Sequence, residues 1–288
     1  MNSPPKLLVI GGYSAGKTHF GAQLLSRLQS RTCTFQLREA SPSLVLLEEA
    51  LVRLSEGMTT SHTSRELFGT ILLPIVDTVG RQVDVVWPEF GGEQVDDFVA
   101  TRRMSSEWIG RIEEANSWIL MLRLMQLRTD EDLVNKAYDS AVDQPADKTQ
   151  PLERSDAIGH GAWSAQARLL ELMQMLLYFK EASLRSRVSI PRLTVLLSCW
   201  DELAKPEGTV PSSVLQEYLP LFADFLTANW MPNEFAIYGL SALSRPLRND
   251  VPDEEFRRLG PEKFGYVIEP DGRKDRDLTL PLKTVLAF

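Results

Sequence analysis

The sequence contains few cysteines, no long apolar run and no basic cluster, and each absence narrows the range of functions. Its two cysteines, Cys33 and Cys199, have no spacing typical of a metal site and offer no disulfide framework. No apolar stretch approaches the roughly 20 residues that a membrane-spanning helix needs. Residues 1–5 lead almost directly into a strand-like segment and lack the pattern of a secretory signal. We therefore expect a cytoplasmic protein without a membrane span.

The charge composition argues against nucleic acid as the main partner. The 288 residues include 31 Lys and Arg against 39 Asp and Glu, which gives a net charge of −8, and no run of Lys or Arg occurs. Proteins that bind nucleic acid through its phosphates usually carry clustered positive charge. A hydrophobic fraction of 43% is enough for a packed core. The length allows one large domain or two small ones, and we expect a single domain over 1–288.

The clearest motif near the N-terminus is a phosphate-binding loop of the pattern G-x-x-x-x-G-K-[ST]. It consists of Gly11, Gly12, Tyr13, Ser14, Ala15, Gly16, Lys17 and Thr18. An apolar run over 6–10 precedes it and predicts a buried strand, while the amphipathic pattern over 18–28 predicts a helix. In this setting the loop N–H groups would surround phosphate oxygens, Lys17 would reach the β- and γ-phosphates, and the Thr18 hydroxyl would bind Mg²⁺. A glycine-rich turn that matches by chance rarely has both neighbours in order.

The segment after this helix predicts an inserted helix, a polar loop and a hairpin. Ser41 is a suitable N-cap, Pro42 suits the first helical position and Gly57 suits the end of the helix. The hydroxyl-rich stretch 58–66 predicts a loop. A hairpin follows, with strands over 67–76 and 83–87. Proline donates no hydrogen bond to a sheet, so Pro74 predicts that the first of these strands is an edge strand.

The end of this hairpin carries a second candidate phosphate contact, Glu89-Phe90-Gly91-Gly92. An acid at a strand end followed by x-x-Gly is typical of nucleotide sites. The carboxylate helps to hold Mg²⁺, and the Gly N–H approaches the γ-phosphate. Here Glu89 stands where Asp is usual, and Gly92 supplies the N–H. The alternative is an ordinary acidic turn after a strand.

The rest of the chain predicts alternating helices and strands. We expect helices over 95–115, 162–184 and 210–230, the last kinked at Pro220, and strands over 117–124, 191–201 and 234–240. A polar insertion over 126–161 and a C-terminal extension over 244–288, with a hairpin at 266–273 and an apolar end, complete the prediction.

Two further motifs follow the late strands, Ser198-Cys199-Trp200-Asp201 and Ser241-Ala242-Leu243. Together with the P-loop and the Glu89–Gly92 turn, they resemble the four motifs of translation-factor-related (TRAFAC) GTPases, in the same order. The resemblance implies that the Asp201 carboxylate accepts hydrogen bonds from guanine N1 and N2. It implies that a backbone N–H of the second motif meets guanine O6. Cys199 replaces the lysine that covers the base and Ser198 replaces Asn or Thr, while Trp200 has no assigned role. The alternative for Asp201 is a helix N-cap.

Most of the chain is similar to bacterial proteins called double-GTPase domain proteins. The similarity rests on the segments Trp87–Gln94, Ser198–Asp201 and Asp277–Pro281. It implies an α/β P-loop NTPase fold, Ras-like, with a mostly parallel sheet, one antiparallel edge strand and helices on both faces. It also implies a GTPase that works beside other proteins encoded with it, in systems proposed to act in conflict with phage.

This interpretation assigns candidate catalytic and metal-binding residues. Thr63 is the expected switch threonine beside Mg²⁺, with Thr59 and Thr60 as alternatives, and Glu93 or Gln94 would orient the attacking water. Thr18, Thr63 and Glu89 form the expected metal set. Arg65 or Arg123 could act as an arginine finger, although a surface ion pair is the favoured interpretation of each, and His62 is expected to be solvated.

Two other functions stay open at this point. One is an ATP-dependent P-loop protein, in which Asp201 only caps a helix. The other is a pseudo-enzyme that binds nucleotide and signals by occupancy alone. In the favoured interpretation, the γ-phosphate and Mg²⁺ order residues 57–66 and 90–96, and protein partners contact this surface.

Overall fold

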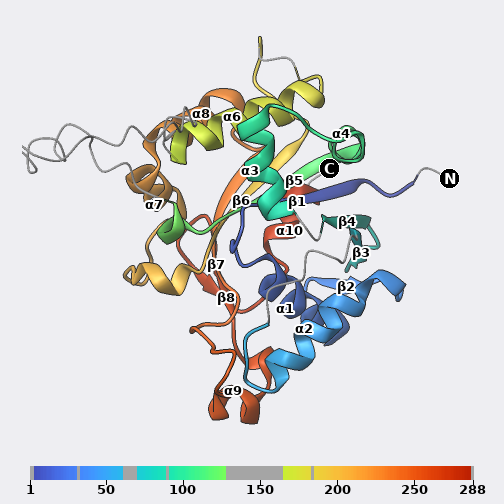
Figure 1. Ribbon diagram of the computed structural model, residues 1–288, viewed down its shortest axis with the longest axis vertical. Helices are drawn as coiled ribbons and strands as arrows, with labels where there is room; N and C mark the ends of the chain where they lie inside the picture. Colours follow the sequence, from blue (N-terminus) through green and yellow to red (C-terminus); the bar gives the residue numbers. More distant parts are fainter. Residues whose placement is uncertain are drawn as a thin grey trace, which may run out of the picture.

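A computed structural model describes residues 3–30, 33–60, 70–88, 91–127, 165–182 and 185–286. In these segments nine strands form one sheet of order β2-β3-β4-β1-β5-β6-β7-β8-β9 (Figure 1). The strands are β1 (Lys6–Gly11), β2 (Phe35–Leu37), β3 (Thr70–Asp77), β4 (Gln82–Pro88), β5 (Ala115–Leu122), β6 (Arg192–Ser198), β7 (Phe235–Ser241), β8 (Tyr266–Ile268) and β9 (Lys274–Asp275). The helices are α1 (Lys17–Ser30), α2 (Val45–Ser55), α3 (Gly91–Thr101), α4 (Ser106–Glu114), α6 (Ala165–Phe179), α7 (Pro211–Tyr218), α8 (Pro220–Asn229), α9 (Glu254–Leu259) and α10 (Pro281–Leu286).

The central strands β4, β1, β5, β6 and β7 run parallel to their neighbours in this order. β2 and β3 at one edge and β8 and β9 at the other edge are antiparallel to their neighbours. The expected mostly parallel sheet with helices on both faces is therefore confirmed, but its antiparallel part is larger than one edge strand.

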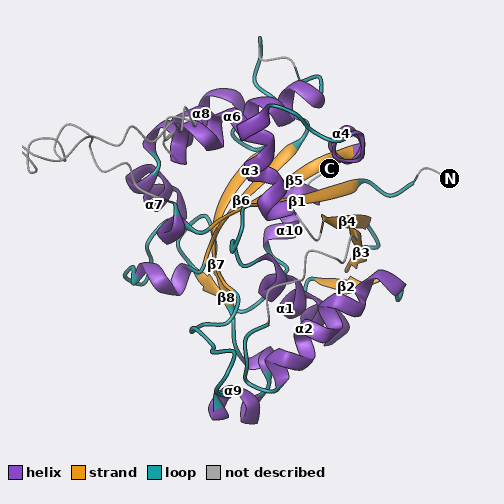
Figure 2. Ribbon diagram, in the orientation of Figure 1, coloured by secondary structure: helices purple, strands orange, loops and turns teal. Residues whose placement is uncertain are grey.

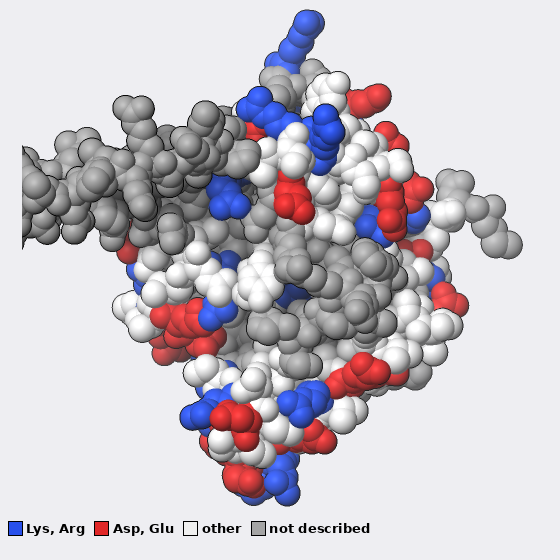
Figure 3. Space-filling view, in the orientation of Figure 1, with Lys and Arg blue, Asp and Glu red and all other residues white. Residues whose placement is uncertain are grey.

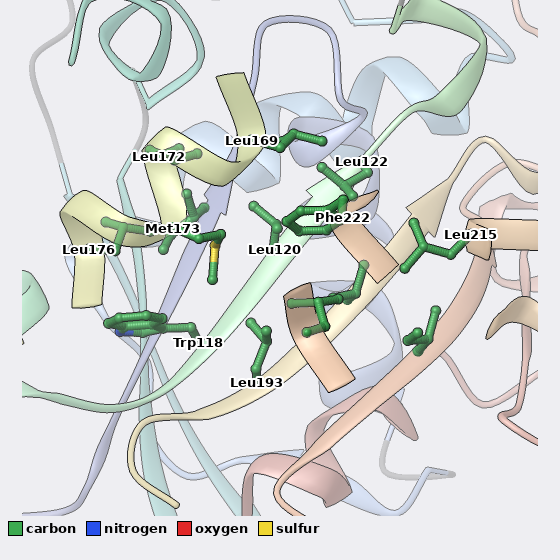
Figure 4. Packing of buried hydrophobic residues seen from close by; sticks show 14 of the residues in the cluster. Trp118, Leu120, Leu122, Leu169, Leu172, Met173, Leu176, Leu193, Leu215 and Phe222 are labelled. Atoms are coloured by element: carbon green, nitrogen blue, oxygen red, sulfur yellow. The ribbon is translucent and has the colours of Figure 1, made fainter. Parts of the chain in front are cut away.

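Side chains of successive strand residues point to opposite faces of the sheet, and each face has its own core. On β1, Leu8 and Ile10 pack into the core covered by α3, α4, α6, α7 and α8. Leu7 and Val9 pack into the core covered by α1, α2 and α10. The two helical layers lie on either side of the sheet (Figure 2). In the first core, side chains of β5, β6, α6 and α8 meet around Trp118 and Phe222, which are fully buried (Figure 4).

The prediction that Pro74 marks an edge strand is wrong, because β2 lies outside β3. β2 pairs only with the last three residues of β3, from Ile75 to Asp77. The Pro74 carbonyl accepts a hydrogen bond from the Arg38 N–H at 2.9 Å, just beyond the end of β2. The N–H that proline lacks would point to this same side, where the β2 ladder has ended. The sheet therefore accommodates the proline at the second strand from its edge.

Two helices expected to be continuous are each divided in two. The segment 95–115 forms α3 and α4, which are separated at Arg102, a residue with φ of 53°, and α4 is capped by the Ser105 hydroxyl. The segment 210–230 forms α7 and α8, which separate at Leu219 because Pro220 begins the second helix. The expected insertion over 126–161 lies outside the described residues except for 126 and 127.

The C-terminal extension packs back onto the domain as expected, with Leu278, Leu280 and Leu282 buried. The Asp277 carboxylate ties it to the start of β2, because it accepts hydrogen bonds from the N–H and hydroxyl groups of Thr34 and Thr279 at 2.5–2.9 Å. Burial alone would raise the pKa of Asp277, but these hydrogen bonds outweigh burial and hold the pKa below its usual value.

Charged side chains of both signs lie on the face of the molecule in Figure 3. On the face in Figure 3, the coloured acidic and basic side chains are intermixed, and the basic ones form no continuous area. Among the described residues, no helix is long and apolar enough to cross a membrane.

Candidate functional site

The P-loop forms the tight turn between β1 and α1 that the motif predicts. A Cβ on Gly11 would lie 3.1 Å from Met121 Cβ and 3.2 Å from the Met121 carbonyl oxygen, so the close approach of β1 to β5 favours glycine here. Ser14 and Gly16 have φ angles of 53° and 79°. Positive φ at these positions curls the backbone, and such a curled backbone in front of a helix N-terminus is suited to bind anions.

Lys17 already lies across this loop. Its ammonium donates hydrogen bonds to the carbonyl oxygens of Gly11 and Gly12, each at 2.8 Å. Thr18 follows in the first turn of α1 and is half-buried. The positive charge and the Thr18 hydroxyl are therefore held beside the turn at which phosphates are expected to bind.

The ends of the other parallel strands bring the remaining candidate residues to the same edge of the sheet. Because β4, β1, β5, β6 and β7 are parallel, the segments that follow them meet at one edge, where ligands bind in open α/β sheets. β1 leads to the P-loop, and β4 ends at Pro88, directly before Glu89 in the sequence. β6 leads to the motif Ser198–Asp201, and β7 leads to Ser241 and Ala242.

The loop after β6 is joined to the loop after β7 by a side-chain hydrogen bond. Ser241 Oγ donates to Asp201 Oδ1 and accepts the N–H of Ser244 at 2.9 Å. Asp201 lies inside the 3₁₀ helix Trp200–Leu203, whose N-cap is Cys199 with a left-handed φ of 52°. Asp201 is therefore not the N-cap of this helix, and the structure does not support the helix-cap alternative.

Trp200 anchors this loop to the sheet. Its indole is buried at 5% exposure and lies flat against β7, where a Cβ on Gly239 would be only 2.5 Å from ring atom Cε3. Glycine at 239 thus makes room for the ring. The sequence assigned no role to Trp200, and the structure gives it a packing role directly beside Asp201.

Ser198 and Ala242 complete the two late motifs. Ser198 Oγ is buried and, within the described parts of the chain, has no hydrogen-bond partner. Buried hydroxyl groups are usually satisfied, so this orphaned group at the sheet edge is suited to a ligand or loop contact. Ala242 directly follows β7 and is half-buried.

The expected γ-phosphate contacts are only partly described. Thr63, Arg65, His62 and Glu89 lie outside the described residues. Gly92 lies in the first turn of α3, where backbone N–H groups have no partner within the helix, and Glu93 follows it in the helix backbone.

The Gln94 side chain contacts the neighbouring helix α4. Its Oε1 accepts a hydrogen bond from the Trp108 indole N–H at 2.6 Å. In this arrangement the Gln94 amide belongs to the contact between α3 and α4.

His19 is a residue that the sequence did not single out. Its Nε2 lies 2.8 Å from Thr59 Oγ1 and 3.2 Å from Thr60 Oγ1, and the Thr60 N–H points to it at 3.4 Å. Burial and, to a smaller extent, the charge of Arg123 lower the pKa of His19 to about 4, so the imidazole is neutral at pH 7. It links α1 to the start of the expected switch loop.

The same segment is held from its other side by the C-terminal extension. The Thr59 N–H donates to the Arg248 carbonyl at 2.9 Å, and the Asp253 N–H donates to the Gly57 carbonyl at 2.8 Å. The described start of the expected loop, residues 57–60, is therefore held by backbone hydrogen bonds. No local pattern of the sequence indicated these contacts.

Arg123 directly follows β5 and makes an ion pair, in agreement with the favoured interpretation. Its Nε donates to Glu202 Oε2 at 2.9 Å, and Nη2 donates to Glu202 Oε1. Its Nη1 lies 3.5 Å from the carbonyl oxygen of Ser14 in the P-loop. Glu202, which the sequence did not single out, is the residue next to Asp201.

The comparison with protein families decides to which family the chain belongs. The family described as Double-GTPase 1 matches residues 8–285, nearly the whole chain. The chain belongs to this family. This membership confirms the resemblance to bacterial double-GTPase proteins. The chain is therefore a GTP-binding protein with a P-loop NTPase fold, and the nucleotides that it binds are GTP and GDP.

Solved structures of GTPases are distantly similar to this Double-GTPase 1 chain. The signal recognition particle receptor SRb-GTP/SRX complex from Chaetomium thermophilum is 13% identical with a TM-score of 0.40, and the match covers 90% of this chain and 99% of that chain. The GTP-bound Ski7 GTPase-like domain of S. cerevisiae is 14% identical with a TM-score of 0.42, and the match covers 87% of this chain and 46% of that chain. The small GTPase Arl6 BBS3 from Trypanosoma brucei, with a bound nucleotide analogue, is 10% identical with a TM-score of 0.33. That match covers 83% of this chain and 88% of that chain. Among curated proteins, no match was found.

Proposed function

We propose that this protein binds GTP and hydrolyses it to GDP and phosphate in the presence of Mg²⁺, and that the nucleotide state controls its contacts with partner proteins. The observation that carries the proposal is the hydrogen bond between Ser241 and Asp201 at the sheet edge that also holds the P-loop. This contact orients a carboxylate at one end of the site while Lys17 provides a cation at the other.

The proposed roles follow from the chemistry of each group. The P-loop N–H groups and Lys17 would hold the phosphates, and Gly92 would offer its N–H to the γ-phosphate. Asp201 would accept hydrogen bonds from guanine N1 and N2, because an ionised carboxylate is an acceptor at both oxygens. Ser241 fixes the position of Asp201, and Ser198 and the Ala242 backbone would complete the base pocket.

A magnesium ion fits the described part of the site. Thr18 offers a hydroxyl in the first turn of α1, beside the anion-binding backbone and close to Lys17. Oxygen donors of this kind are the ligands that Mg²⁺ prefers, and Glu89 and Thr63 would add two more. The ion would neutralise charge on the β- and γ-phosphates.

Hydrolysis needs a water molecule held in line with the γ-phosphate. We assign this task to Glu93 or Gln94, both in α3 directly after Gly92. An amide oxygen can accept a second hydrogen bond, so the contact of Gln94 Oε1 with the Trp108 indole is compatible with this assignment. We propose residues 57–66 and 90–96 as the partner surface. A role in bacterial conflict with phage, in the cytoplasm, is the setting that we propose.

One titration series tests the proposal against both alternatives. Fluorescent GDP and ADP are titrated into the protein with Mg²⁺, and release of phosphate from GTP is then followed under single-turnover conditions. We expect tight binding of GDP, weak binding of ADP and measurable phosphate release. Preference for ADP would replace the proposal by an ATP-dependent function. GTP that binds but remains intact with Mg²⁺ would leave a nucleotide-binding pseudo-enzyme.

A further inference from the structure

The guanidinium of Arg123 bridges two loops of the site. Two of its nitrogens face both carboxylate oxygens of Glu202, so the pair is bidentate and fixes the plane of the group. The third nitrogen, Nη1, is thereby directed to the carbonyl oxygen of Ser14 in the P-loop, 3.5 Å away. A single side chain from the end of β5 thus connects the loop after β6 to the loop after β1.

The charges around Arg123 show why a cation is needed there. Asp201 and Glu202 are adjacent acids in the same 3₁₀ helix, and a nucleotide would bring further negative charge to this edge. The side chains of Arg123 and Glu202 are each 28% exposed, so solvent screens their charges only in part. Without Arg123, the Glu202 carboxylate would lose this ion-pair partner directly beside Asp201.

Cys199 cannot supply this cation, although it lies in the right place. The Cys199 Sγ would lie 3.8 Å from a Cβ on Gly16 of the P-loop, so the Cys199 side chain points to that loop. Burial raises the pKa of the Cys199 thiol to about 11 despite the opposing effect of the Arg123 charge, and the thiol is therefore neutral at pH 7. The guanine motif has lysine at this position.

We propose that Arg123 is a positioning residue for nucleotide binding that holds the Asp201 loop against the P-loop and supplies, from β5, the positive charge that is missing at Cys199. The inference rests on the proposed function, since it assigns a role within that site. It also distinguishes Arg123 from an arginine finger, because its bidentate contact is with Glu202, the neighbour of Asp201, at the base end of the site.

The test uses Arg123→Gln in the full chain, a neutral substitution that keeps the first three side-chain carbons. We expect the dissociation constants of fluorescent GDP and of a non-hydrolysable GTP analogue to rise equally, by about tenfold, because one charge-assisted contact is lost. Single-turnover hydrolysis at saturating GTP should stay within about twofold of the parent, since a positioning residue at the base end does not act on the transferred phosphate. The double variant Arg123→Gln, Cys199→Lys should recover most of the affinity.

A matched control is Arg192→Gln. Arg192 forms an ion pair with Glu234, is similarly exposed, and lies at the opposite end of the strands, so its loss should leave nucleotide affinity unchanged. Thermal melting verifies that each variant is folded.

Several results would overturn the assignment. Parent-like affinity in folded Arg123→Gln would show that the bridge has no role in binding. Reduced hydrolysis with unchanged affinity would make Arg123 a catalytic finger. If the folded double variant Arg123→Gln, Cys199→Lys binds GDP no better than Arg123→Gln, then Arg123 does not supply the charge that is missing at Cys199, and the assignment fails. If the parent protein binds no guanine nucleotide at all, the proposed function fails and this inference fails with it.

Discussion

Gly239 has no space for a side chain, and this makes Gly239→Ala a sharp test of how the base loop is supported. An alanine Cβ at this position would lie 2.5 and 2.6 Å from two ring atoms of Trp200 and 3.1 Å from Ile268 Cβ. Carbon atoms in contact usually stand about 3.5–4.0 Å apart, so the indole would have to retreat by roughly 1 Å. Trp200 is buried in the core and cannot retreat freely.

Both stability and affinity should change as a result. Overpacking of this kind lowers the free energy of unfolding by about 1–3 kcal/mol. Because Asp201 follows Trp200 in the chain, the displaced ring should also move the carboxylate away from guanine. A charge-assisted hydrogen bond contributes about 1.5–3 kcal/mol, so the dissociation constant of GDP should rise about tenfold or more.

The assay combines urea unfolding with fluorescent GDP titration well below the melting temperature. Gly110→Ala is the matched control, because Gly110 lies in α4 with no atom within 4 Å of the added Cβ. In this control the free energy of unfolding should rise by up to about 1 kcal/mol, because alanine has a higher helix propensity than glycine. Its affinity for GDP should equal that of the parent. A smaller ring in the double variant Gly239→Ala, Trp200→Phe should recover part of the affinity. The reasoning is refuted if Gly239→Ala has the same free energy of unfolding and the same dissociation constant for GDP as the parent.

Four further predictions concern the site and its support. Lys17→Ala should lose most triphosphate binding in a titration while melting like the parent, because the ammonium balances phosphate charge rather than stabilising the core; parent-like GTP affinity would contradict the P-loop assignment. Asp201→Asn should lose about a hundredfold or more in GTP affinity, since two charge-assisted hydrogen bonds of about 1.5–3 kcal/mol each are involved, and could gain affinity for xanthine nucleotides; unchanged guanine selectivity would exclude the assignment. Asp277→Asn should lower the free energy of unfolding by about 1–3 kcal/mol at pH 7. Because the folded pKa of Asp277 is depressed, its contribution is present above the usual pKa and is lost as pH falls through the folded pKa, so urea titrations of parent and variant should converge in acid. Hydrogen exchange in 57–66 and 90–96 should be slower with a GTP analogue than with GDP, and equal protection would exclude a γ-phosphate switch.

The local motifs of this protein could be predicted because each is complete within a few consecutive residues. The P-loop needs a strand, a curl that glycine permits, a lysine and a helix, and residues 6–28 contain all four in order. The helix end at Gly57 and a kink at Pro220 were indicated for the same reason, because glycine and proline act on the backbone directly. Pro74 misled the prediction, since its consequence depends on where a distant three-residue strand ends.

The support of the site was decided only by the tertiary structure. Ser241 and Asp201 are 40 residues apart, and their contact depends on the parallel pairing of β6 with β7, which sets Ser198 opposite Leu240. Arg123 and His19 carry no local pattern that separates them from surface residues. Their roles arise because the carboxyl ends of the parallel strands meet at one edge of the sheet. Side chains from segments that are distant in sequence lie close together there, and they form ion pairs and hydrogen bonds with one another.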